Sequence, residues 1–327
     1  MTARQQLTQY LTGKWIPPVL AAVAEFGIAD ELTDKPLTAD ELADRVGADP
    51  RALYRVLRAA ASIGVFAEDS DGRFVLTETA ELLRSGGPGS MRAAARMFAL
   101  EPFWTPYARI AESVRTGEPA FASTFGVSIY DYLGTHPDDA AVFGATVATF
   151  HGQAMAPIVA AHDFSAYGTV VDVGGGSGEL LIELLTAYPT IRGVLLELDA
   201  VLPAARAAFE AAGLIDRVQL VAGDFFTAVP AGDAYLIKSC LHNFTDDQAT
   251  RILRAIRAGG GPVLVAETMI PAGNAPHYSK FDDIEMLVIA GGADRTEREW
   301  SDLVAAAGFT PREVVQCDER FSLLVAD

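Results

Sequence analysis

The feature that most constrains the fold is a glycine-rich turn between an apolar run and a helical segment. Residues 170–178 read Val-Val-Asp-Val-Gly-Gly-Gly-Ser-Gly, and the helical pattern Glu179–Ala187 follows directly. Glycines allow the backbone to turn tightly and to approach a ligand where a Cβ atom would collide. A strand, a tight turn and a helix in this order predict the first unit of a parallel α/β sheet with a ligand at its carboxyl edge.

Short apolar runs continue from this turn toward the C-terminus, with helical segments between them. Such runs are typical of a parallel sheet that is buried on both faces. We expect its strands at residues 169–173, 193–197, 218–222, 233–238 and 262–267.

Capping boxes mark two further helices in the same half of the chain. Thr245 with Gln248 predicts a helix over 246–257, and Thr296 with Glu299 predicts a helix that ends at Gly308. Two last apolar runs, 312–316 and 321–326, are close enough in sequence to pair antiparallel. The expected fold class is therefore α/β, a Rossmann-like sheet that a C-terminal antiparallel hairpin closes.

The N-terminal residues predict a smaller and mainly helical domain. Thr38 and Glu41 form a capping box, and Asp49 before Pro50 begins a second helix that Gly64 can close. A hairpin signal follows at 65–76, so this part resembles a winged helix. We divide the chain into a winged-helix-like domain at 1–90, a helical linker at 91–165 that contributes to a substrate pocket, and a Rossmann-like domain at 166–327.

Composition limits the partners of the protein. The formal net charge is −18, and nucleic-acid binding draws its affinity from a basic face, so we expect no nucleic-acid partner. The runs of apolar residues are too short for a membrane span, and we expect a cytoplasmic protein without a membrane contact. The two cysteines are too few for a disulfide framework, and we expect no metal site.

Acidic residues stand where three successive strands are expected to end. Asp172 lies within the glycine turn, Glu197 ends the second strand, and Asp224 follows the third. A pyrophosphate gains nothing from carboxylates, whereas the sulfonium and ammonium of S-adenosylmethionine do. The glycine spacing, with Gly174, Gly176 and Gly178 as Gly-x-Gly-x-Gly, also differs from the NAD fingerprint. We therefore expect S-adenosylmethionine as the cofactor, ahead of NAD.

Several segments together are similar to a known family. They are the glycine turn at 172–178, Gly-Asp-Phe at 223–225, Lys-Ser-Cys-Leu-His-Asn-Phe at 238–244, and Gly-Gly-Ala-Asp-Arg-Thr at 291–296. Arg-Thr-Gly-Glu-Pro-Ala-Phe at 115–121 adds to them. The chain resembles, over nearly its full length, the S-adenosylmethionine-dependent O-methyltransferases of small molecules, which include the plant caffeic-acid type and bacterial antibiotic enzymes.

The resemblance implies an N-terminal domain that forms a homodimer and a role for each matching residue. By position, Glu197 would bind the ribose, Asp224 and Phe225 the adenine, and Lys238 the cofactor. His242 would be the general base that deprotonates the acceptor hydroxyl, with Glu267 and Asp294 beside its imidazole. Histidine suits this task because its pKa lies near the working pH, and a carboxylate on one ring nitrogen fixes the tautomer.

The chain departs from the family pattern in three respects, which concern four residues. Asn243 and Phe244 stand where the family usually has Asp and Trp, Glu197 replaces an Asp, and Asp294 replaces a Glu. None of these changes removes the base. The change at Asn243 puts the choice of acceptor in doubt.

Apolar and aromatic residues match the acceptor pocket of the family. A pocket of this kind suits a flat phenolic ring, for which a polyketide-type natural product is the expected class. With Asn243, the residues expected to bind the acceptor are Phe103, Trp104, Phe143, Val147, Phe150 and Met286. Two alternatives stay open, namely a hydroxylase or cyclase on the same fold and a winged-helix transcriptional regulator.

Overall fold

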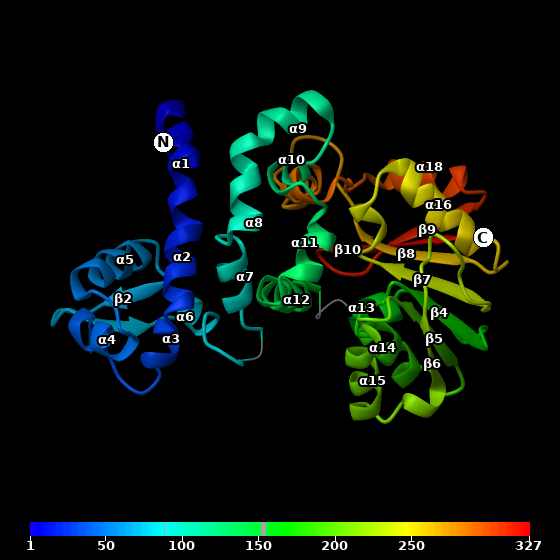
Figure 1. Ribbon diagram of the computed structural model, residues 1–327, viewed down its shortest axis with the longest axis horizontal. Coiled ribbons are helices and arrows are strands. Elements are labelled where there is room, and N and C mark those ends of the chain that lie inside the picture. Colours follow the sequence, from blue (N-terminus) through cyan, green and yellow to red (C-terminus); the bar gives the residue numbers. More distant parts are fainter. Residues whose placement is uncertain (88, 152–154) are drawn as a thin grey trace. The chain divides into compact units, whose positions relative to one another are not determined.

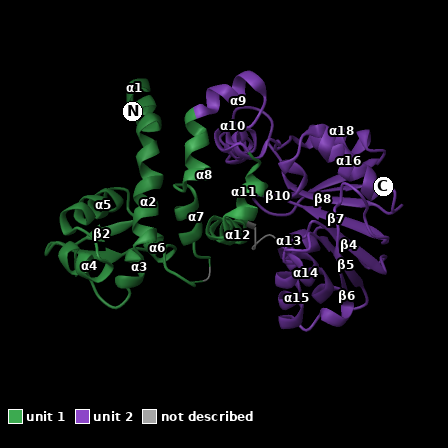
Figure 2. Cartoon of the chain, viewed as in Figure 1, with its two compact units in different colours: residues 1–108, 127–150 green, residues 109–126, 151–327 purple. Residues whose placement is uncertain are grey.

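The computed structural model describes residues 1–87, 89–151 and 155–327, and it divides into two compact units (Figure 2). Unit 1 comprises residues 1–108 and 127–150, and unit 2 comprises residues 109–126 and 151–327. Each unit has its own hydrophobic core.

Unit 1 combines a helical N-terminus with a small three-stranded sheet in the order β1-β3-β2. Its core lies between the helices and this sheet, around Ile28, Leu42, Leu57 and Phe74, none of which is measurably exposed. Its helices and strands are α1 (Ala3–Thr12), α2 (Ile16–Glu25), α3 (Ile28–Glu31), β1 (Leu37–Thr38), α4 (Ala39–Val46), α5 (Pro50–Ser62), β2 (Phe66–Glu68), β3 (Arg73–Leu76), α6 (Glu78–Glu81), α7 (Arg92–Met97), α8 (Glu101–Trp104), α11 (Ile129–Thr135) and α12 (Pro137–His151).

The predicted winged-helix pattern is confirmed in unit 1. The Thr38–Glu41 capping box begins α4, the Asp49 side chain caps α5, and β2 pairs antiparallel with β3 to form the wing. The short strand β1 adds to the edge of this hairpin by pairing with β3, which the sequence pattern did not predict. A strand of two residues carries no periodic signal, because its pairing depends on the distant partner.

Unit 2 is built on a seven-stranded sheet in the order β6-β5-β4-β7-β8-β10-β9 (Figure 1). The first five of these strands are parallel to one another, and the hairpin β9–β10 joins antiparallel beside β8, as expected. The strands are β4 (Thr169–Val173), β5 (Arg192–Glu197), β6 (Val218–Ala222), β7 (Ala234–Lys238), β8 (Val263–Thr268), β9 (Pro311–Gln316) and β10 (Phe321–Ala326).

Helices cover both faces of this sheet. One core contains α16 (Asp246–Arg257) and α18 (Glu297–Ala306), and the other contains α13 (Met155–Ala160), α14 (Glu179–Ala187) and α15 (Leu202–Ala211). Alternate residues of β4 point to the two cores, with Val171 in the first and Val170 in the second. The predicted doubly wound fold is confirmed, and the strand boundaries differ from the predicted ones by one residue at most.

Residues 109–126 belong in space to unit 2, although they precede its other residues in the chain. Helices α9 (Ile110–Thr116) and α10 (Ala120–Phe125) pack against η6 (Met286–Ala290), a turn of π-helix after α17 (Ser279–Glu285). The domain boundaries that the sequence predicts at residues 90 and 165 remain a prediction. No helix in the described ranges is long and apolar enough to cross a lipid bilayer.

Candidate active site

The residues proposed for the cofactor come together at the carboxyl edge of the sheet. The turn after β4 is tied to β5 because Gly174 N–H donates to the carbonyl of Leu196 (2.9 Å), and β5 is tied to the next turn by Gly223 N–H and the carbonyl of Glu197 (3.0 Å). Ser239 N–H, just after β7, donates to the carbonyl of Ala266 (3.1 Å). Parallel strands place these turns on one edge, which is where α/β proteins bind their ligands.

The glycine turn adopts a backbone that requires glycine. Gly174, Gly176 and Gly178 all have positive φ angles, of 69°, 60° and 83°. At Gly178 a Cβ atom would also collide with the ring of Phe209, whereas the space beside Gly176 is open. The turn therefore leaves a cradle without side chains next to Gly176, as a bound ligand requires.

Asp172 lies beneath this turn in an unusual environment. Its side chain is completely buried, and neither carboxylate oxygen has a hydrogen-bond partner among the described residues. Burial raises the pKa of Asp172 to about 7, while the Lys238 ammonium opposes the rise and Glu197 adds to it. A buried carboxylate without a partner is costly and favours a cationic ligand nearby, so this part of the site fits S-adenosylmethionine.

Glu197, Asp224 and Phe225 line the same edge. Glu197 accepts from the N–H of Gly176 (3.1 Å) and of Leu198 (2.6 Å), and each oxygen keeps a second lone pair for a ligand. Asp224 is exposed and accepts from Phe226 N–H (2.8 Å), which folds the turn after β6. The Phe225 ring lies directly against Gly174. Glu197 thus binds the backbone of the glycine turn directly, and Phe225 packs against that turn from the one after β6.

Lys238 ends β7 between the two halves of the site. Burial lowers its pKa, and the carboxylates of Glu267 and Asp172 oppose that change. Its Nζ atom lies 4.9 Å from the centre of the Phe321 ring and 3.4 Å from Ser239 Oγ. Lys238 therefore supplies a positive charge between Asp172 below the glycine turn and Glu267 on the next strand.

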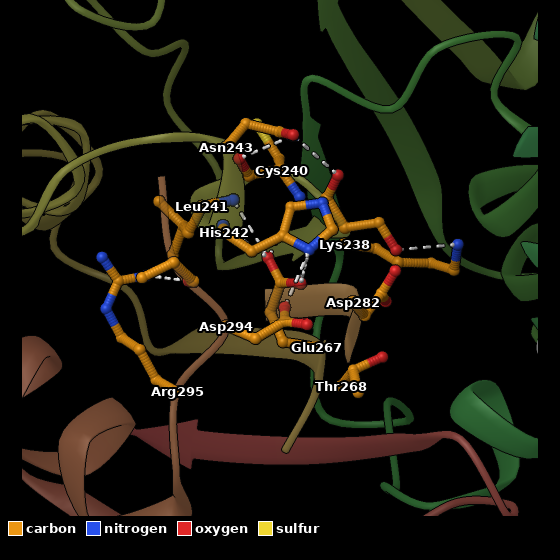
Figure 3. A network of polar contacts seen from close by, with 12 residues as sticks. Lys238, Cys240, Leu241, His242, Asn243, Glu267, Thr268, Asp282, Asp294 and Arg295 are labelled. Carbon is orange, nitrogen blue, oxygen red and sulfur yellow. Dashed lines mark hydrogen bonds and ion pairs between the residues drawn. The ribbon is translucent and has the colours of Figure 1, made fainter. Parts of the chain in front are cut away.

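A short loop after β7 carries His242 and is anchored by Glu267 (Figure 3). Glu267 Oε1 accepts from the backbone N–H of Cys240 (3.0 Å), Leu241 (3.0 Å) and His242 (3.4 Å). The loop begins at Ser239, whose φ of 48° is the only positive value outside glycine in the described residues. The carboxylate thus holds a strained turn in place.

The imidazole of His242 lies between two carboxylates. Its Nδ1 atom is 3.2 Å from Asp294 Oδ1 and 3.6 Å from Glu267 Oε2, and the side chain is 13% exposed. Burial alone would lower the pKa of His242, but the negative charge of Glu267 and the hydrogen bond to Asp294 outweigh it and raise that pKa. With Nδ1–H donated to a carboxylate, Nε2 carries the lone pair of the neutral ring.

Two aspartates that the sequence analysis did not single out complete this cluster. Asp283 Oδ1 accepts from the backbone N–H of Asp294 (3.0 Å), and Asp282 pairs with Arg320 (3.5 Å). Burial, followed by the charge of Asp294, raises the pKa of both carboxyls. Asp282 also contributes to the raised pKa of His242. Both residues lie on α17, more than ten residues from Asp294 in the chain, so no local motif indicates them.

The residues expected to bind the acceptor divide between the units. In unit 1, the rings of Phe103 and Phe143 stack with centroids 5.7 Å apart, and Phe150 lies beside Phe98 (6.4 Å). Trp104 and Val147 are also residues of unit 1.

In unit 2, Met286 begins η6, and Asn243 lies in the His242 loop. The amide nitrogen of Asn243 donates to the backbone carbonyl of Cys240 (3.2 Å), so it stabilises its own loop. The acceptor role of these seven residues stays a prediction. Among the described residues, no cluster of three or more His, Cys, Asp or Glu side chains could hold a metal ion.

The chain matches two family models over most of its length. Residues 107–310 match the O-methyltransferase domain, and residues 8–86 match the O-methyltransferase dimerisation domain. The chain belongs to the S-adenosylmethionine-dependent O-methyltransferase family. It is an enzyme that transfers a methyl group.

Named relatives place it among enzymes of natural-product biosynthesis. It is 40% identical to the phenazine O-methyltransferase PhzM of Lysobacter antibioticus, over 98% of this chain and 95% of that protein. It is 37% identical to an 8-amino-8-demethylriboflavin N,N-dimethyltransferase of Streptomyces davaonensis, over 94% and 90%. Methyl transfer to both oxygen and nitrogen therefore occurs among its relatives.

A solved structure agrees with this placement. The chain matches an O-methyltransferase from neocarzinostatin biosynthesis, in complex with S-adenosylmethionine and 2-hydroxy-5-methyl naphthoic acid, with a TM-score of 0.84 and 33% identity over 95% of each chain. This match and the two family models confirm the predicted fold class. The three named relatives are all methyltransferases, and the hydroxylase or cyclase alternative finds no support among them.

Proposed function

We propose that this enzyme methylates a phenolic hydroxyl of a small aromatic natural product and that His242 is the general base. The observation that carries the proposal is the contact between His242 Nδ1 and Asp294 Oδ1 (3.2 Å), with Glu267 beside it. Such a pair fixes the tautomer whose Nε2 atom accepts a proton, and it stabilises the imidazolium that results.

A neutral phenol is a weak nucleophile, and it needs this base. When His242 removes its proton, the oxygen becomes able to attack an electrophilic carbon. S-adenosylmethionine supplies that carbon as an activated methyl group. The chain itself contributes the acidic and glycine-rich edge around Asp172, Gly174, Gly176, Gly178 and Glu197, with Asp224, Phe225 and Lys238 beside it, which we infer to bind the cofactor.

The preferred acceptor is a flat, fused aromatic system with a free hydroxyl. The named relatives in the comparisons act on a phenazine and a riboflavin derivative or bind a naphthoic acid, all of which are planar rings. The stacked pair Phe103–Phe143 in unit 1 offers aromatic faces of the same kind. We infer that these rings, with Trp104, Val147, Phe150, Asn243 and Met286, select the acceptor, and that residues 8–86 form a homodimer.

The test is methyl transfer from labelled S-adenosylmethionine to paired acceptors. Hydroxyphenazines and hydroxynaphthoic acids would be compared with the same rings that carry an amino group in place of the hydroxyl. We expect label on the hydroxylated acceptors and a loss of on the order of 10²-fold or more in kcat for His242→Ala. His162→Ala, which changes a histidine paired with Tyr167 away from this cluster, is the matched control. If methyl transfer to hydroxyl groups continued undiminished in His242→Ala, His242 would not be the general base.

A further inference from the structure

Arg295 directly follows Asp294 (Figure 3), and it donates hydrogen bonds to both loops that form the His242–Asp294 pair. One loop runs from Ser239 to Thr245 and carries His242, and the other runs from Gly291 to Thr296 and carries Asp294. Neither loop has a helix or strand beyond the short turn at 241–243, although Arg295 forms an isolated β-bridge with Met269. Contacts of individual residues therefore set the position of one loop relative to the other.

Two backbone contacts already join these loops. Ala293 N–H donates to the carbonyl of His242 (2.9 Å), and Gly292 lies so close to the backbone of His242 and Asn243 that a Cβ atom would collide with it. These contacts join the loops at Gly292 and Ala293. Each loop is also anchored separately, by Glu267 at the backbone of Cys240–His242 and by Asp283 at the N–H of Asp294.

The guanidinium of Arg295 joins the two loops a second time, from the residue that follows Asp294. It donates to the carbonyl of Ala293 (2.9 Å), to the carbonyl of Phe244 (3.0 Å) and twice to Asp246 Oδ1 (2.7 and 2.9 Å). Its side chain is only 4% exposed and lies over the ring of Trp300, 4.8 Å from the centroid. One rigid group thus binds the residue before Asp294, the second residue after His242 and the start of α16.

We propose that Arg295 is a positioning residue of methyl transfer, because its guanidinium holds the loop of His242 against the loop of Asp294. The effect on catalysis rests on the proposed role of His242 as the base. The geometry requires an arginine, because a planar fork with five N–H donors can reach these three acceptors together, whereas a lysine ammonium is a point charge with three donors.

The chain offers a matched control in Arg217. This arginine also donates to three backbone carbonyls, of Leu185 (2.9 Å), Tyr188 (2.8 Å) and Ile191 (2.7 Å). It directly precedes β6 and therefore lies at the amino edge of the sheet, opposite the edge of His242. A substitution there removes the same kind of contact without touching the site.

The experiment compares Arg295→Lys with Arg217→Lys in the full-length protein. The first readout is the pKa of His242, from an NMR titration of the histidine ring signals that His242→Gln assigns. We expect Arg295→Lys to lower this pKa by about half a unit or more, because the bond to Asp294 loosens. We expect kcat to fall by about tenfold or more, with KM for S-adenosylmethionine nearly unchanged. Arg217→Lys should lower only the midpoint of thermal unfolding.

A second variant covers the case in which Arg295→Lys does not fold. Asp246→Asn removes the exposed carboxylate that holds the guanidinium and leaves the arginine in place. We expect a smaller change of the His242 pKa in the same direction. An unchanged His242 pKa in whichever of these variants folds would overturn the proposal. The NMR titration measures the pKa of His242 without any turnover. It therefore tests the role of Arg295 separately from the activity of His242→Ala, which tests the proposed base.

Discussion

His242 Nδ1 lies 3.2 Å from Asp294 Oδ1, although 52 residues separate them in the chain. Glu267, from a third segment, reaches the same nitrogen at 3.6 Å and also binds the backbone on which the imidazole stands. The two carboxylates therefore have different tasks. Asp294 orients the ring. Glu267 raises the pKa of His242 through its negative charge and also fixes the loop.

Asp294→Asn tests the first of these tasks. The raised pKa of His242 means that the neutral ring, which is the proposed base, is lost as the pH falls through that pKa. Without the Asp294 charge the pKa falls, so the acid limb of kcat/KM should move to lower pH. The plateau should fall by up to about 10⁴-fold, because an amide can stabilise the wrong tautomer. Full pH profiles of kcat/KM for both enzymes measure the two effects, and an unmoved acid limb would contradict the role of Asp294.

Glu267→Leu and Glu267→Gln separate the structural part of the second task from its electrostatic part. Leucine leaves the N–H groups of Cys240, Leu241 and His242 unpaired, and each buried orphan costs about 1–3 kcal/mol. Glutamine keeps an acceptor oxygen and loses only the charge. We expect urea unfolding to show a much larger loss of stability for Glu267→Leu. Glu267→Gln should lower the pKa of His242, and equal stabilities for the two variants would count against the anchoring.

Asp172→Asn should change how stability depends on pH. The pKa of Asp172 rises from its ordinary 3.8 to about 7 on folding, so the folded state favours the protonated acid. That contribution is fully present below about pH 4 and disappears as the pH rises through about 7, a change of about 4 kcal/mol. Relative to wild type, Asp172→Asn should therefore gain stability between pH 5 and pH 8. Thermal unfolding without ligand at several pH values measures the difference in stability between this variant and wild type. A difference that does not change with pH would show that burial does not raise the pKa of Asp172.

Gly176→Ala tests the cofactor cradle against a matched glycine. Gly176 and Gly213 have similar φ angles, of 60° and 69°, and a Cβ atom at either position meets nothing within 4 Å. Both alanine variants should lose on the order of 1–2 kcal/mol of stability, because an L-residue is strained there. Only Gly176→Ala should weaken binding of S-adenosylhomocysteine, since its methyl group enters the cradle. Calorimetric titration compares them, and equal affinities would exclude Gly176 from the site.

Local sequence signals predicted the framework of the site well. Four capping residues, at Thr38, Asp49, Thr245 and Thr296, begin helices where their side chains indicated. The strands at the carboxyl edge were readable because runs of buried aliphatic residues carry a strong pattern in a parallel sheet. The turn after β4 followed from its glycines.

The parts that were not predicted depend on contacts between distant segments. Arg295 is one residue of a motif in the sequence. Its contacts could not be predicted, because its acceptors at Phe244 and Asp246 lie about 50 residues away. The packing of α10 against the π-helical turn η6 also has no local signature, and a π-turn lacks the regular period of an α-helix. Periodicity shows which face of a segment is apolar, and it does not show which partner covers that face.

The positive φ of Ser239 bears on how the enzyme diversifies. Its conformation is enforced by the carboxylate of β8, so the segment with the imidazole takes its shape when the sheet assembles, before any small molecule arrives. On the proposed function, the aromatic residues of α8 and α12 that we infer to select the acceptor can then change without disturbing the proposed proton acceptor.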